Sequence, residues 1–151
     1  MHLADVSWTD ARDADADLAL LPVGSTEQHG PHAPLGVDAI AAEGIARETA
    51  DRRDDVLVAP TIPVGVAEEH RAFDGTLWVT EDTLRAYVGD VLRSLAHHDV
   101  DGVVVVNGHG GNVDALREVC GRVTRDGDLY AVAYTWFDAV DPDEVGLSLG
   151  H

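Results

Sequence analysis

Residues 103–112 read VVVVNGHGGN, four valines followed at once by a histidine set among glycines and asparagines. Consecutive β-branched residues are typical of a strand that is buried on both faces, as in a parallel sheet. Polar residues that follow such a strand lie at its carboxyl end, where open α/β sheets place their binding sites. This stretch therefore predicts a parallel sheet with a functional loop at the end of one strand.

The same arrangement occurs about eighty positions earlier in the chain. Residues 18–23 read LALLPV and are followed by GSTEQHG, so a second apolar strand also ends in a polar cluster. Because parallel strands end at the same edge of a sheet, we expect the two clusters to lie close together.

The rest of the chain alternates between strand and helix patterns. Thr80 can cap a long helix, with Glu81 and Asp82 favourably placed in its first turn. The order reads βαβ(loop)αβαβ, which predicts an α/β fold with a mainly parallel sheet flanked by helices. Further strands are expected at residues 56–59 and 129–133, and helices at residues 40–51, 80–98 and 113–125. The inward residues of the long helix are predicted to be Leu84, Tyr87, Val88, Val91 and Leu95.

Length and charge limit the classes of function. The 151 residues make one ordinary domain, and no apolar run approaches the roughly 18 residues that span a bilayer. Acidic residues number 28 against 10 basic residues, all of them arginine, for a net charge of -18. This charge repels nucleic acid and anionic membranes, so we expect neither as a partner, and we interpret it as adaptation to a salty cytoplasm.

Cysteine use and the N-terminus also favour a cytoplasmic location. Residues 1–17 are acidic and carry no basic leader with an apolar core, and Cys120 is the single cysteine. One cysteine cannot form an internal disulfide and fits a reducing compartment. Its place on the apolar face of the predicted helix 113–125 favours a core role over a nucleophile.

The polar clusters carry residues suited to binding metal ions. Glu27 and His29 stand two positions apart, so in an extended segment both side chains project from the same face. Asp38 follows closely, and its two oxygens could bridge two ions about 3.5 to 4 Å apart. The glycines around His109 allow a close approach, while Asn107 and Asn112 can hydrogen-bond the turn or cap the next helix.

Ordinary structural roles explain each residue better when it is taken alone, because metal-like spacings this short arise readily by chance. Glu27 could be a solvated charge, His29 and His32 turn histidines, and the Asn-Gly pair a tight turn. Other site types fail on direct inspection. Val113 breaks the dinucleotide-binding glycine pattern, the chain has no lysine for a phosphate loop, and it has no Gly-x-Ser-x-Gly elbow.

The two clusters resemble those of creatininase-family amidohydrolases. The matching segments are LPVGSTEQHGPH at 21–32, PLGVD at 34–38 and VNGHGGN at 106–112, with IPVG at 62–65 and EHRAFDGT at 69–76 between them. The resemblance implies a three-layer α/β/α fold, two divalent ions (zinc, manganese or iron) and a homo-oligomer, often a hexamer. It also implies hydrolysis of non-peptide C–N amide bonds in small molecules, such as cyclic creatinine or the formamide of an archaeal flavin and deazaflavin intermediate.

Carried over residue by residue, the resemblance implies that Glu27 and His109 bind one ion and His29 the other. Asp38 would bridge the two ions. His70 and His151 are candidates for proton donation or substrate contact, since histidine titrates near neutral pH. Arg71, beside His70, is the nearest basic residue for a phosphate-bearing substrate.

The chain departs from the family pattern at Gly111, where creatininase itself carries a further glutamate ligand. Branches with the His-Gly-Gly-Asn pattern use a glutamate from a later motif instead. Residues 1–151 therefore resemble the N-terminal portion of the single family domain. We expect an amidohydrolase, with a formamide favoured over creatinine as substrate. The alternative is a binding or assembly module that lacks the last ligand.

Overall fold

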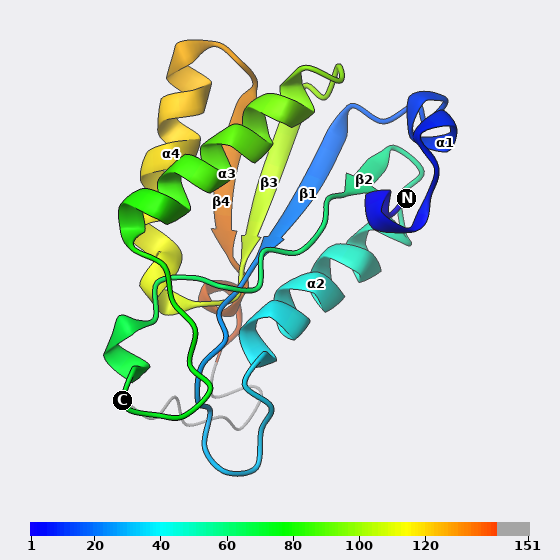
Figure 1. Cartoon of the computed structure of the whole chain (residues 1–151). Coiled ribbons are helices and arrows are strands. Elements are labelled where there is room, and N and C mark those ends of the chain that lie inside the picture. Colours follow the sequence, from blue (N-terminus) through cyan, green and yellow to red (C-terminus); the bar gives the residue numbers. More distant parts are fainter. Residues whose placement is uncertain (142–151) are drawn as a thin grey trace.

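The computed structural model describes residues 1–141 and contains a four-stranded parallel sheet. The strands are β1 (Leu18–Val23), β2 (Val56–Val58), β3 (Gly102–Asn107) and β4 (Tyr130–Thr135), in the spatial order β2-β1-β3-β4. β1 pairs with β2 and β3, and β3 pairs with β4. The predicted α/β class and parallel sheet are confirmed, and the carboxyl ends of β1, β3 and β4 lie side by side at one edge of the sheet (Figure 1).

Helices cover both faces of this sheet. Alternate strand residues such as Ala19, Leu21 and Val105 pack in one core with α3 (Glu81–Ala96) and α4 (Val113–Asp126). Leu20 and Val106 point to the opposite face and pack with α2 (Val37–Ala50). The period-2 alternation of strand side chains thus produces three layers. Short helices complete the described residues: α1 (Trp8–Arg12), η1 (Leu3–Asp5), η2 (Glu68–His70), η3 (Gly110–Asn112) and η4 (Trp136–Ala139).

Several predicted boundaries move by a few residues. α2 begins at Val37 rather than at residue 40, so Asp38 lies in its first turn. Thr80 caps α3 as predicted, since its hydroxyl accepts a hydrogen bond from the Thr83 amide. The predicted inward face of α3 is partly wrong. Tyr87, a predicted inward residue, is 55% exposed, whereas Leu92, which the prediction leaves out, is fully buried. The buried stripe of Leu84, Val88, Leu92 and Leu95 leaves Tyr87 at its margin.

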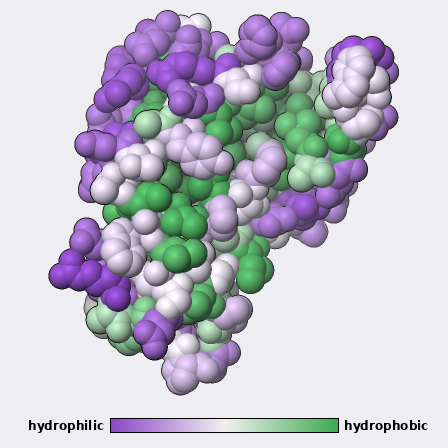
Figure 2. Space-filling model, viewed as in Figure 1, coloured by the Kyte–Doolittle hydropathy of each residue, from purple (hydrophilic) through white to green (hydrophobic). Residues whose placement is uncertain are grey.

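Apolar side chains also reach the surface. Figure 2 shows hydrophobic residues gathered over the middle of the face that carries α3 and the loop before it. That loop, residues 59–80, exposes Phe73, Leu77 and Trp78. α2 packs against β1, β2 and β3 on one side of the sheet. Tyr130 and Val132 of β4 face this same side, and both are exposed. No helix within residues 1–141 is long and apolar enough to cross a membrane.

Cys120 is 2% exposed in the core between α4 and the sheet, which agrees with its predicted core role. Burial raises the pKa of its thiol to about 12. Because this pKa exceeds the pKa of the same thiol in the unfolded chain, the neutral thiol favours the folded protein at low pH. That contribution is lost as the pH rises from about 8.5, the ordinary cysteine pKa, through the folded value.

We expect iodoacetamide at pH 9 to label Cys120 slowly in the native protein and rapidly in urea, because only the unfolded chain then holds a thiolate in contact with solvent. Mass spectrometry of timed samples measures both rates. Equal rates in native and denaturing buffer would contradict the burial of this thiol.

Candidate metal centre

Three elements bring Glu27, Asp38 and His109 to the carboxyl ends of the central strands. Glu27 lies in the loop after β1, Asp38 in the first turn of α2, and His109 just after β3. α2 can start this close to β1 and β3 because a glycine directly follows each of these two strands. A Cβ atom on Gly24 would lie 2.3 Å from the amide nitrogen of Ala39, and one on Gly108 would lie 2.2 Å from the carbonyl oxygen of Asp38.

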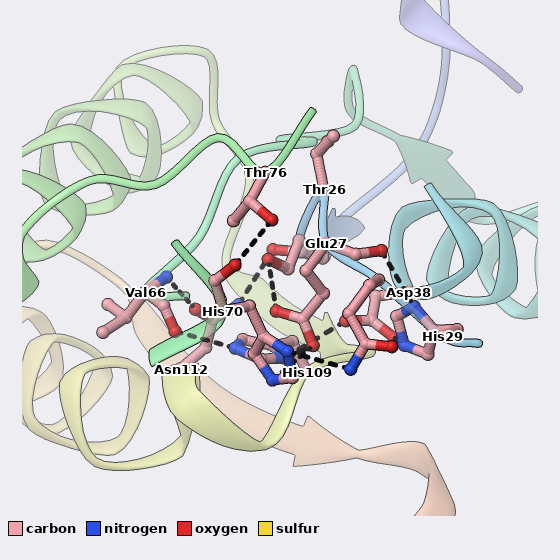
Figure 3. Close-up of polar contacts among 12 residues, drawn as sticks. Thr26, Glu27, His29, Asp38, Val66, His70, Thr76, His109 and Asn112 are labelled. Atoms are coloured by element: carbon pink, nitrogen blue, oxygen red, sulfur yellow. Dashed lines mark hydrogen bonds and ion pairs between the residues drawn. The ribbon is translucent and has the colours of Figure 1, made fainter. Parts of the chain in front are cut away.

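The three side chains point toward one another (Figure 3) and are almost fully buried. Nδ1 of His109 lies 3.3 Å from Oε1 of Glu27 and 3.1 Å from Oδ2 of Asp38. Ser25 donates a hydrogen bond of 3.0 Å to Oε2, the other oxygen of Glu27. The backbone amide of Glu27 donates a hydrogen bond to the carbonyl of Leu35, which closes the loop that carries Glu27. Two buried carboxylates and an imidazole nitrogen therefore face a common point.

This arrangement could hold a divalent cation. One ligand atom from each of the three residues lies within 4.8 Å of the other two. Oδ2 of Asp38 is buried and has no hydrogen-bond partner despite the nearby Nδ1 of His109, so it keeps a lone pair for a cation. Carboxylate oxygen and imidazole nitrogen are common ligands of zinc, manganese and iron. The donor set fits such an ion.

His29 lies on the other side of Asp38. Its Nδ1 is 3.2 Å from the carbonyl oxygen of Glu27, which can only accept, so Nδ1 carries a proton. In neutral His29 the unprotonated Nε2 then faces Oδ1 of Asp38 at 2.9 Å. Two acceptors this close need a proton or a cation between them. Asp38 thus offers one oxygen to each histidine, an arrangement compatible with a bridge between two ions.

Charge coupling is strong within this cluster. Burial alone would raise the pKa of Glu27, but His109 and Ser25 hold it below its usual value. Burial alone would lower the pKa of His109, yet Asp38, Glu27 and the Val66 carbonyl raise it to about 10. The two carboxylates therefore attract positive charge into the site, either as a proton on His109 or as a metal ion.

His70 approaches the same cluster from the loop before α3. Its Nε2 lies 3.6 Å from Oε1 of Glu27, and its Nδ1 lies 3.2 Å from Nε2 of Gln28. The amide of Gly30 donates to Oε1 of Gln28, which turns the Gln28 amino group toward His70. Nδ1 of His70 then accepts, and the neutral ring carries its proton on Nε2, the atom facing Glu27. His151 lies outside the described residues.

Sequence reasoning missed some contributors to this site. Ser25 could have been found, because it stands two positions before Glu27 in an extended segment. Val66 could not, since it contributes through its backbone, whose carbonyl accepts from Nε2 of His109 at 2.7 Å. Asn112 does not cap α4 with its side chain but reaches Gly24 and Val66 instead.

The chain matches the family model of creatininase, described as creatinine amidohydrolase, over residues 4–148. The chain belongs to the creatininase family. This match spans the strands, the loops and every residue of the cluster just described.

Individual relatives differ in their reactions. The mycofactocin precursor peptide peptidase of Mycobacterium ulcerans is 40% identical over 116 residues, which cover 72% of this chain and 46% of the relative. The creatinine amidohydrolase of Pseudomonas putida is 32% identical over 159 residues, covering 94% and 60%. A solved structure titled "Creatininase Mn" superposes with a TM-score of 0.81 at 26% identity, covering 99% of this chain and 65% of that one. The chain thus spans about half the length of the relatives it matches by sequence.

Proposed function

We propose that this protein hydrolyses a carbon–nitrogen amide bond with divalent metal ions held by Glu27, Asp38, His109 and His29. The convergence of two buried carboxylates with Nδ1 of His109 carries the proposal. Bound there, a divalent ion polarises the amide carbonyl and lowers the pKa of water toward neutrality. Membership of a family that includes creatinine amidohydrolase supports the reaction class.

The chain's own groups have distinct roles in this proposal. Glu27, Asp38 and His109 bind one ion, and Asp38 shares its second oxygen with the position faced by His29. His70 carries a proton on Nε2 beside Glu27 and would donate a hydrogen bond from it to the substrate, while the proton gained by the leaving nitrogen comes from the attacking water. Gln28 is a positioning residue, because its amide holds the His70 ring in that tautomer.

The ion near His29 is expected to bind more weakly than the ion near His109. The resemblance to creatininase places a glutamate ligand at position 111, but a Cβ atom on Gly111 would lie 2.3 Å from the Val66 carbonyl oxygen. The backbone cannot accommodate a side chain there without moving. Within residues 1–141, the side chains that face this second position are those of His29 and Asp38.

A peptide is the substrate class that the relatives favour. The mycofactocin precursor peptide peptidases are 38–42% identical to this chain, whereas a 2-amino-5-formylamino-6-ribosylaminopyrimidin-4(3H)-one 5'-monophosphate deformylase from Methanobrevibacter smithii is 30% identical over 104 residues. Arg71, the predicted phosphate contact, is paired with Glu68 at 2.9 Å. Exposed Phe73, whose ring centroid lies 6.3 Å from that of His70, suits an apolar side chain of a peptide, as do exposed Leu77 and Trp78 farther along the same loop. Formamide hydrolysis remains the second candidate.

Metal removal tests this function. We expect the purified chain to contain bound Zn, Mn or Fe, and its activity on peptide, formamide and creatinine substrates to fall to the buffer level after chelation. Adding one metal at a time should restore activity, because Glu27, Asp38 and His109 supply carboxylate and imidazole ligands that can rebind a divalent ion. Elemental analysis and product release measure the two quantities. Hydrolysis that survives complete metal removal would rule out the mechanism.

A further inference from the structure

The side chain of Asn112 connects three segments beneath the metal centre. It is fully buried at the start of α4. Its amino group donates to the carbonyl of Gly24 at 3.0 Å and to Oδ1 of Asn107 at 3.3 Å. Its carbonyl oxygen accepts from the amide of Val66 at 2.9 Å. Asn112 therefore joins the ends of β1 and β3 to the loop before α3.

The residue that Asn112 holds is the one that contacts His109. The Val66 carbonyl oxygen lies 2.7 Å from Nε2 of His109 (Figure 3). A carbonyl can only accept, so Nε2 must carry a proton. A neutral imidazole carries only one proton, so Nδ1 of neutral His109 is unprotonated. Nδ1 is the atom that faces Glu27 and Asp38. The Val66 carbonyl thus selects which ring nitrogen is available to a cation.

Glycines make these contacts possible. A Cβ atom on Gly65 would lie 2.4 Å from Oδ1 of Asn112, and one on Gly111 would lie 2.6 Å from Nε2 of His109. Neither position can carry a side chain while Asn112, Val66 and His109 keep their separations. Glycine at both positions is consistent with a close, specific contact among these three residues.

We propose that Asn112 is a positioning residue for metal binding. By holding Val66, it fixes the His109 ring in the Nε2–H tautomer and aims Nδ1 at the cation. The inference extends the proposed function, since it assumes that the cluster of Glu27, Asp38 and His109 binds a metal ion. It assigns Asn112 no contact with substrate or ion.

The test titrates Zn²⁺ into the metal-free chain by calorimetry and reads the His109 tautomer by ¹⁵N NMR of the Zn²⁺-loaded protein. In Asn112→Ala we expect Zn²⁺ affinity to fall about 10-fold, the lower end of the usual cost of losing a direct partner of a metal-bound histidine, because Asn112 acts on His109 through Val66. The ¹⁵N signal of a protonated Nε2 should broaden or shift, because the Val66 carbonyl is no longer held in place.

Two further variants keep the test decisive. Asn112→Asp retains an oxygen acceptor for the Val66 amide at nearly the same volume, so it should preserve the Nε2–H signal even if it lowers stability. Val123→Ala lowers stability through a core cavity in the same helix, away from the cluster, and should leave Zn²⁺ affinity unchanged. A wild-type chain that binds none of Zn²⁺, Mn²⁺ and Fe²⁺ would refute the metal centre itself. Wild-type Zn²⁺ affinity and tautomer in Asn112→Ala would overturn the role of Asn112.

Discussion

Replacing Asp38 by asparagine is expected to abolish tight metal binding while leaving the fold intact. The two Asp38 oxygens lie 2.9 Å from Nε2 of His29 and 3.1 Å from Nδ1 of His109, so one carboxylate serves both sides of the centre. Asparagine keeps the shape but removes the negative charge and turns an amino group toward one histidine. We expect affinity for both ions to fall by more than the roughly 100-fold that loss of an outer partner can cost.

The free energy of unfolding of the metal-free protein should fall in this variant, because Asp38 is a buried partner of the His109 ring. Asp38 lies in the first turn of α2, where a negative charge favours the helix by about 0.3–1 kcal/mol. Asp114 provides a matched control, because it follows a valine in the first turn of α4 and is exposed. Asp114→Asn loses the same helix interaction but should keep full metal content. Two tightly bound ions per chain in Asp38→Asn would show that Asp38 is not the bridge.

Replacing Gly108 by alanine is expected to destabilise the protein by about 3 kcal/mol, the upper part of the usual range for overpacking. The new Cβ atom would lie 2.2 Å from the carbonyl oxygen and 3.0 Å from the carbonyl carbon of Asp38. Because these are backbone atoms, the start of α2 must move as a unit. That movement would also displace the Asp38 carboxylate from His109, so Zn²⁺ affinity should fall with stability.

Gly110 supplies the control within the same loop. A Cβ atom there meets nothing within 4 Å, so Gly110→Ala should change the free energy of unfolding by less than about 0.5 kcal/mol. Urea unfolding and Zn²⁺ titration of both variants measure the difference. Similar midpoints for the two variants would contradict the direct contact between the end of β3 and the start of α2.

Local sequence patterns predicted the elements well because the forces behind them are local. The valine run at residues 103–106, the capping residue Thr80 and the inward position of Cys120 on α4 all follow from periodicity and backbone chemistry. Tyr87 shows the limit of this reasoning. Its spacing fits the apolar stripe of α3, yet whether a marginal position is covered depends on what packs beside the helix.

The sequence by itself determined that apolar strands alternate with helices, that Glu27, His29 and Asp38 follow one strand, and that His109 follows another. Their placement at strand ends made convergence predictable, because parallel strands share one carboxyl edge. Only the tertiary structure decided how the ligands are held. Asn112 reads locally as a helix cap, but its amino group bonds Gly24, 88 positions away, and Val66 acts through a backbone carbonyl that every residue type possesses. Contacts between distant segments depend on the packing of the whole sheet, and a backbone acceptor leaves no mark in the side-chain sequence.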